Sequence, residues 1–303
     1  MTNYTEIISK NIDNCIIDTS LPCKKHKGKV RDTYDLGEQL LIAVTDRLSA
    51  FDRVLAAIPF KGRVLNQLSA WWCEQTKDII DNHMIEMPSP NVSLVKKCKP
   101  FAVEFILRGY ITGSTSTSLW THYNAGERKY CGHDLPDGLT KNQKLPQPLL
   151  TPTTKETEHD RPLSGEEILE LNLLTKDELD FINKKSLELF NYGQKIAAEN
   201  GLILVDTKYE FGKNKEGNII LIDEIHTPDS SRFWLTESYE ALFKQNKEPD
   251  NLDKEIIRLW YKSKCDPYKD KVLPKAPDEL IITLSQSYIK LYEMLTGTEI
   301  GIQ

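Results

Sequence analysis

Ionisable side chains alternate along residues 202–212, a stretch whose other members are mostly apolar and typical of a buried β-strand. Because the side chains of a strand point alternately to its two faces, Asp206, Lys208 and Glu210 fall on one face. Three ionisable groups side by side are unfavourable in an apolar core, but they can hold a metal ion and an anion. This face is therefore the first candidate for chemistry.

A second strand-like run, residues 218–224, follows a short polar turn. If residues 216–217 form the turn, Glu210 lies directly opposite Asp223. Two facing carboxylates repel unless a cation lies between them, and Mg²⁺ usually takes one or two carboxylates plus phosphate oxygens. The hairpin predicts a magnesium–phosphate site. The alternative is an edge hairpin with its polar face in water.

A basic segment, residues 28–32, opens another predicted hairpin. Gly28 lets the backbone approach a ligand closely, and Lys29 and Arg31 share one face of the predicted strand, where both can reach a polyphosphate. A solvated basic strand end is the alternative. The sequence has neither a P-loop nor a G-x-G-x-x-G motif, so phosphate binding needs another arrangement such as this one.

Two loops could also contact ligands. Residues 227–232 gather hydroxyls, backbone amides and Arg232 and can bind phosphate; the alternative is a turn followed by a helix capped by Ser230 or Asp229. Residues 151–160 could form a mobile loop over a ligand, or an ordinary surface loop.

Composition excludes several classes of protein. The net charge of −6 and the pI of about 5.6 argue against nucleic-acid binding but leave room for small anionic ligands. Six scattered cysteines without a C-x-x-C pair indicate free thiols in a reducing compartment. No apolar run approaches the roughly 20 residues that span a bilayer, and the N-terminus lacks a signal-peptide core. We expect a cytoplasmic protein without nucleic-acid or membrane partners.

The chemistry-bearing residues need strands to position them. The pattern predicts strands first and then helices around the hairpin: strands over 30–35, 39–45 and 101–111, and helices over 63–78, 175–199 and much of 235–303. Ser164 and Glu167 predict a capping box, whereas residues 112–165 hold little periodicity. Regular βαβ alternation is missing, so we expect an α+β fold with antiparallel sheets.

Taken in order, several stretches closely resemble one family, SAICAR synthetase (phosphoribosylaminoimidazole-succinocarboxamide synthase). They are residues 28–32, 49–52, 61–66, 104–110, 112–114, 151–160, 205–212 and 227–232. The likeness runs from about residue 20 to residue 300. The length and the insert around residues 120–150 look most like the long, single-function fungal form.

The resemblance implies an ATP-dependent ligase of purine synthesis. ATP, L-aspartate and carboxyaminoimidazole ribotide (CAIR) would give the succinocarboxamide SAICAR, ADP and phosphate, through an acyl phosphate. It also implies two lobes with antiparallel sheets and an ATP cleft between them, distantly similar to ATP-grasp and kinase folds. We expect an ATP-binding lobe over 1–111, a lobe with metal and substrate sites over 112–303, and a monomer.

The resemblance also assigns the nucleotide site. Lys29 and Arg31 would hold the ATP phosphates, and the strand containing Glu104 would lie by the adenine. Glu210 and Asp223 would bind Mg²⁺ beside the phosphates, in agreement with the hairpin argument.

The CAIR site follows in the same way. Arg108, Ser114 and Arg232 would bind CAIR, with Ser231 and Arg232 near its phosphate.

The resemblance also implies two catalytic residues and a loop over the ligands. Lys208 and Asp206 would lie near the reacting carboxylate and the aspartate as catalytic residues. Lys155, His159 and Asp160 would belong to a substrate-binding loop that closes over the ligands.

Two other classes stay open. A degenerate nucleotide sensor would lack a metal carboxylate or Lys208, and both are present here. A small-molecule kinase would turn over without aspartate.

Overall fold

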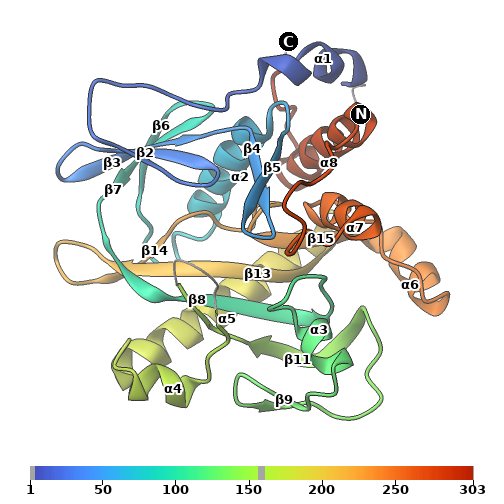
Figure 1. Ribbon diagram of the computed structural model, residues 1–303. Helices are drawn as coiled ribbons and strands as arrows, with labels where there is room; N and C mark the ends of the chain where they lie inside the picture. The colour runs from blue at the N-terminus through green and yellow to red at the C-terminus, as the bar shows by residue number, and fades with distance from the viewer. Residues whose placement is uncertain (1–3, 156–160, 303) are drawn as a thin grey trace.

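Two antiparallel sheets organise the chain, and the computed structural model describes residues 4–155 and 161–302 (Figure 1). The first sheet has the order β1-β2-β3-β7-β6. Its strands are β1 (Lys25–Lys27), β2 (Arg31–Asp35), β3 (Gln39–Val44), β6 (Met84–Ser89) and β7 (Val92–Lys96). A separate hairpin joins β4 (Arg47–Ala50) to β5 (Arg53–Ala57).

The second sheet is built around two long strands, β8 (Lys99–Ile111) and β13 (Leu202–Lys213). Its other members are β11 (Gln143–Leu150), β12 (Thr153–Thr154), β14 (Ile219–Ile222) and β15 (Ser231–Leu235). Figure 1 shows β8 beside β13, with the first sheet on one side of this pair and β11 on the other. The mixed α/β architecture with antiparallel sheets confirms the predicted fold class.

On the side of β13 that faces away from β8, the pairing is divided between two short strands, β14 and β15. β14 pairs with residues 210–213 and β15 pairs with residues 202–207, and both run antiparallel to β13. The eight residues 223–230 therefore loop out opposite Lys208 and Tyr209. Asp223 and His226 take positive φ angles of 63° and 49° in this loop, a costly conformation that clusters at functional sites.

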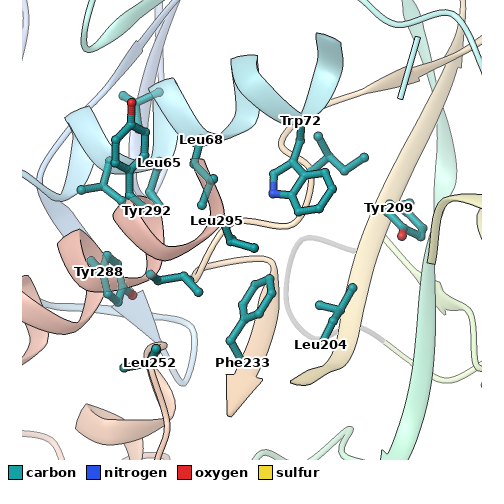
Figure 2. Close-up of a cluster of buried hydrophobic side chains, with 14 of the residues drawn as sticks. Leu65, Leu68, Trp72, Leu204, Tyr209, Phe233, Leu252, Tyr288, Tyr292 and Leu295 are labelled. Carbon is teal, nitrogen blue, oxygen red and sulfur yellow. The ribbon is translucent and has the colours of Figure 1, made fainter. Parts of the chain in front are cut away.

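The helices cover these sheets. They are α1 (Thr5–Lys10), α2 (Lys61–Gln75), α3 (Leu119–Asn124), α4 (Gly165–Glu170), α5 (Lys176–Glu199), α6 (Thr236–Lys244), α7 (Glu255–Lys264) and α8 (Asp278–Thr296), with a 3₁₀ turn at Ile12–Asn14. Figure 2 shows the core where α2 and α8 meet β13 and β15, around Trp72, Tyr288, Leu204 and Phe233. These side chains are buried, so this packing fixes the position of β13 under the loop.

The capping box predicted at Ser164 and Glu167 is confirmed, and the structure has a second one at Thr175 and Glu178. The predicted helix over 175–199 is α5, and it ends at Asn200 as expected.

Residues 112–165 contain more structure than predicted. Besides α3 and β11 they form a short hairpin of β9 (Lys129–Tyr130) and β10 (His133–Asp134). A small hydrophobic cluster around Leu119, Tyr123 and Leu145 stabilises this region. Its apolar residues are too widely spaced to show a period, so the sequence analysis missed it.

The register predicted for the hairpin is wrong by one residue. Glu210 pairs with Ile222, not with Asp223, because the turn spans residues 214–218. The Asn214 side chain accepts a hydrogen bond of 2.8 Å from the backbone N–H of Asn218, which favours the longer turn.

The predicted boundary at residue 111 coincides with the end of β8, which itself pairs with β13 of the second sheet; the division into lobes stays a prediction. All six cysteines are free thiols. Among the described helices, none combines the length and the apolar character needed to cross a membrane.

Candidate active site

Lys208 lies at the centre of a group of carboxylates. Its Nζ is 3.3 Å from an oxygen of Glu104 on β8 and 3.0 Å from an oxygen of Asp223, and it also bonds Glu210. β13 brings Lys208 and Glu210 to one face, as the alternation predicted. Although Asp223 lies outside the ladder, its positive φ coincides with the point where the loop turns its carboxylate back to Lys208.

Two further cations close this group. Arg31, the first residue of β2, bonds Asp223 and lies 2.5 Å from an oxygen of Glu224. Lys155, which follows β12, bonds Glu210. Arg31 comes from the first sheet, so the pair Arg31–Asp223 joins the two sheets across a sequence separation of 192 residues.

Burial and neighbouring charges shift the pKa values of Glu210 and Asp223 in opposite directions. Burial raises the pKa of Glu210, and the neighbouring charge of Asp223 adds to this although Lys208 opposes it. Burial would also raise the pKa of Asp223, but the charges of Arg31 and Lys208 outweigh it and hold that pKa well below its usual value. Burial would lower the pKa of Lys208, yet the three surrounding carboxylates raise it. Lys208 therefore stays a full positive charge at neutral pH.

Asp206 is the centre of a second charged group. It is 5% exposed, bonds Arg232, and lies 3.7 Å from a guanidinium nitrogen of Arg108. Arg232 also lies 3.5 Å from Glu255, which pairs with Arg258 at 3.2 Å. This arrangement presents buried guanidinium groups, which suit phosphate and carboxylate ligands.

A cavity of about 350 Å³ joins the two groups. Lys208 and Glu104 line one part of it, and Arg108, Asp206 and Arg232 line another. The rest of the wall comes from the β4–β5 turn, the loop after β8, and the segments around α7, with the lining residues Asp52, Thr115, Ser116, Asp229, Lys254 and Tyr268 among them. The volume suits a small ligand.

The donor set can be tested against Mg²⁺. Within the described residues no group of three or more His, Cys, Asp or Glu side chains could hold a metal. Glu210 and Asp223 nevertheless share Lys208 as a partner, so they approach one another. Two carboxylates fit Mg²⁺ when phosphate oxygens and water complete its shell.

The structure brings together most of the predicted site residues. Ser231 is buried, and its hydroxyl lies 2.7 Å from that of Thr207. Ser114 is buried beside the cavity wall, and its carbonyl accepts a bond of 2.6 Å from Lys262. Residues 227–232 lead into β15, so the alternative of a capped helix there is wrong.

Lys29 differs from its prediction. It lies in a bend before β2, not on the strand face it was expected to share with Arg31. Its ammonium is 2.9 Å from Asp52, at an exposed position beside the cavity. The backbone turns at Gly28, whose N–H donates to the carbonyl of Arg31, and this ends the strand before Lys29. His159 and Asp160 lie outside the described residues.

Sequence reasoning missed a set of charged residues at the cavity. Asp253, Lys254 and Arg258 line the cavity, and Lys61 and Glu255 pair with the lining residues Asp229 and Arg258. Glu255 and Arg258 are spaced as neighbours on a helix, which is common on any surface helix. What marks the set is the burial of Lys61, Asp253 and Glu255 and the position of the others on the cavity wall, and the sequence shows neither.

Comparison with known proteins gives the family of the chain. A profile of the SAICAR synthetase family matches residues 24–275. The phosphoribosylaminoimidazole-succinocarboxamide synthase of Legionella pneumophila (strain Lens) is 60% identical over 93% of this chain and 91% of its own.

Solved structures agree as well. The structure titled SAICAR-synthase from Saccharomyces cerevisiae complexed SAICAR is 32% identical, covers 94% of this chain and 99% of its own, and has a TM-score of 0.80. A SAICAR synthetase (Type-2) in complex with ADP is 25% identical, covers 91% of this chain and 99% of its own, and has a TM-score of 0.70. In sequence this chain is far more similar to the Legionella protein than to the Saccharomyces protein, so the comparisons support the family and not a particular likeness to the fungal form.

The family profile spans most of the chain, and residues from four of the stretches that carried the resemblance, 49–52, 104–110, 205–212 and 227–232, line one charged cavity. The chain therefore belongs to the SAICAR synthetase family, the ATP-dependent ligases that join CAIR to L-aspartate in de novo purine biosynthesis.

Proposed function

We propose that the two charged groups divide the reaction between them. The group around Lys208 holds the triphosphate of ATP, with Arg31 and Lys29 as further phosphate ligands and the strand of Glu104 beside the nucleotide. The group around Asp206 holds CAIR. The observation that carries this proposal is the single cavity lined by Lys208 at one part and by Arg108 and Arg232 at another.

Charge supports the nucleotide site. The carboxylates of Glu104, Glu210, Asp223 and Glu224 face the cations of Arg31, Lys155 and Lys208, which leaves one net negative charge. A lone polyphosphate would be repelled by that excess, and a divalent cation reverses it. When bound, Mg²⁺ would be held by Glu210 and Asp223 and would neutralise charge on the transferring phosphoryl group.

The CAIR site needs positive charge in a buried place. Burial would lower the pKa of Arg232, but Asp206 and Glu255 raise it, so its guanidinium stays charged. Arg108 is held by a bond of 2.8 Å to the Thr151 hydroxyl and by a bond of 3.1 Å to the Thr117 carbonyl. Both guanidiniums are thus preorganised, and Ser114 and Ser231 add hydroxyls nearby.

The chemistry follows from the poor reactivity of a carboxylate. An oxygen of the CAIR carboxylate attacks the γ-phosphorus of ATP, the bond to the β-phosphate oxygen breaks, and ADP leaves. The amine of L-aspartate then attacks the acyl carbon, loses a proton, and expels phosphate as the amide forms. Lys208 stabilises charge on the phosphoryl group, Asp206 orients Arg108 and Arg232, and Lys155 contacts the ligands beside Glu210.

We also propose that the protein works as a cytoplasmic monomer. The free cysteines support a reducing compartment, and the length of the chain, which resembles that of the long fungal form, supports the monomer.

An isotope experiment tests the acyl phosphate. CAIR labelled with ¹⁸O in its carboxylate is converted with ATP and L-aspartate, and the released phosphate is analysed by mass spectrometry. We expect one ¹⁸O atom in each phosphate, because the attacking carboxylate oxygen leaves with the phosphoryl group. Unlabelled phosphate would refute the intermediate. A reaction without ATP controls for exchange with water.

A further inference from the structure

A pair of charges, Lys61 and Asp229, lies at the cavity and has no role in the reaction described above. Lys61, the first residue of α2, is fully buried, and its Nζ lies 2.9 Å from Oδ2 of Asp229. The hydroxyl of Tyr288 on α8 donates to Oδ1 of the same carboxylate at 2.7 Å. Burying an ammonium and a carboxylate is unfavourable unless both are well paired. Figure 2 shows Tyr288 in the core beside α2.

Asp229 connects this buried pair to the cavity. Asp229 and Lys254 both line the cavity wall. The backbone N–H of Lys254 donates to the carbonyl of Pro228, which places Lys254 against the loop that carries Asp229. Lys61 and Tyr288 hold the carboxylate of Asp229 in place. The loop that carries Asp229 contacts the backbone of Lys254, so these two residues also help to position Lys254.

Lys254 differs from the other cations of the cavity. Arg108, Arg232, Arg258 and Lys208 each lie within ion-pair distance of a carboxylate. In the part of the chain that the structure describes, no carboxylate lies that close to the ammonium of Lys254. A half-buried ammonium at a cavity wall without a carboxylate partner has the chemistry of an oxyanion ligand.

We propose that Lys254 binds an oxyanion of a non-nucleotide substrate, and that the buried cluster of Lys61, Asp229 and Tyr288 positions it and tunes its charge. This rests on the proposed function, which places CAIR and L-aspartate in the cavity. The oxyanion is a phosphate or carboxylate, and it belongs to one of these two substrates. Arg232 and Ser230 line the same cavity.

The surroundings of Lys254 make its charge sensitive to the cluster. Burial lowers its pKa to about 8. Asp229 and Glu224 oppose this, and the positive charges of Arg258 and Lys61 add to it. Binding of an oxyanion by Lys254 should therefore weaken above about pH 8, as the ammonium loses its proton.

Steady-state kinetics of Lys254→Met test the binding role. We expect the KM of either CAIR or L-aspartate to rise about 10-fold or more, as for a lost charge-assisted hydrogen bond, while the KM of ATP stays within about twofold. The substrate whose KM rises identifies the source of the oxyanion. Lys264→Met changes an exposed lysine at the end of α7, the helix that begins directly after Lys254, and is the matched control. Unchanged KM values for both substrates would overturn the proposal.

A conservative variant gives a readout beyond affinity. Lys254→Arg keeps a positive charge at every accessible pH. We expect it to retain binding and to remove the fall of kcat/KM above about pH 8 for the substrate identified. The same alkaline fall in this variant would show that another group titrates.

Tyr288→Phe and Lys61→Met test the positioning cluster. Each change leaves the negative charge of Asp229 less compensated, so that charge stabilises the protonated form of Lys254 more strongly. The fall of kcat/KM at alkaline pH (the alkaline limb) should therefore move to higher pH. Tyr292→Phe, on the same helix and also buried, is the matched control and should leave the limb in place. If Lys61→Met does not fold, Tyr288→Phe carries the test alone, and an unmoved limb would refute the positioning role.

These outcomes are separable from those of the proposed function. Arg232→Ala tests the CAIR site without touching Lys254. If Arg232→Ala raises the KM of CAIR and Lys254→Met changes neither KM, only the inference about Lys254 is wrong.

Discussion

Asp206→Ala should weaken the fold and strengthen the binding of CAIR at the same time. The carboxylate of Asp206 is 5% exposed and lies between two guanidiniums, Arg232 and Arg108. Removing this carboxylate leaves the positive charges of Arg232 and Arg108 with less negative charge nearby, in a site largely shielded from water. An incoming phosphate or carboxylate can then take over the position of the lost charge.

The magnitude follows from this geometry. Removing one partner of a buried ion pair costs about 3–5 kcal/mol. Glu255 remains 3.5 Å from Arg232, and the cavity admits water, so we expect the lower end, about 3 kcal/mol. With about 2.1 cal/mol/K of unfolding entropy per residue, a chain of 303 residues should lose about 5 °C in Tm.

Differential scanning fluorimetry with and without CAIR is the assay. Saturating CAIR should raise the Tm of Asp206→Ala more than that of the wild type, while turnover falls. Asp206→Asn keeps the shape and one acceptor, so it is the matched control and should show a smaller loss. A fall in Tm below about 1 °C, or a smaller shift with CAIR than in the wild type, would refute the reasoning.

Four other variants test the remaining groups. Glu210→Gln and Asp223→Asn should each lower kcat by at least about 100-fold with native circular dichroism, since both carboxylates are needed for the metal; near-normal turnover of either would remove the assignment. Arg232→Ala should raise the KM of CAIR far more than that of ATP, and steady-state kinetics with equal effects on both would contradict its place. His226 is held neutral, because burial lowers its pKa from 6.5 to about 3. Its contribution is complete above pH 6.5 and is lost as the pH falls toward 3, with a slope of up to about 1.4 kcal/mol per pH unit. His226→Gln should flatten urea-unfolding stability over that range, and an unchanged slope would exclude His226.

Some of the site could be read from local patterns. Alternation along β13 places Lys208 and Glu210 on one face whatever the rest of the chain does, because successive side chains of a strand alternate. The capping boxes at Ser164 and Thr175 are equally local.

The register of the hairpin shows where local reasoning ends. A turn at residues 216–217 and a turn over 214–218 are both compatible with the sequence, and they differ by one residue in pairing. The hydrogen bond from the backbone N–H of Asn218 to the Asn214 side chain favours the longer turn. Asp223 then lies beyond the paired residues of β13 and β14, and its carboxylate contacts Lys208 from there.

The sequence by itself determined the periodic elements, the face on which the charges of β13 lie, and the family. Only the tertiary structure decided the partners: Arg31 with Asp223, Asp206 with Arg108 and Arg232, and Lys61 with Asp229. The reason is physical. Periodicity and capping depend on residues a few positions apart, whereas the pairing of buried charges depends on the packing of sheets and helices that are far apart in the chain.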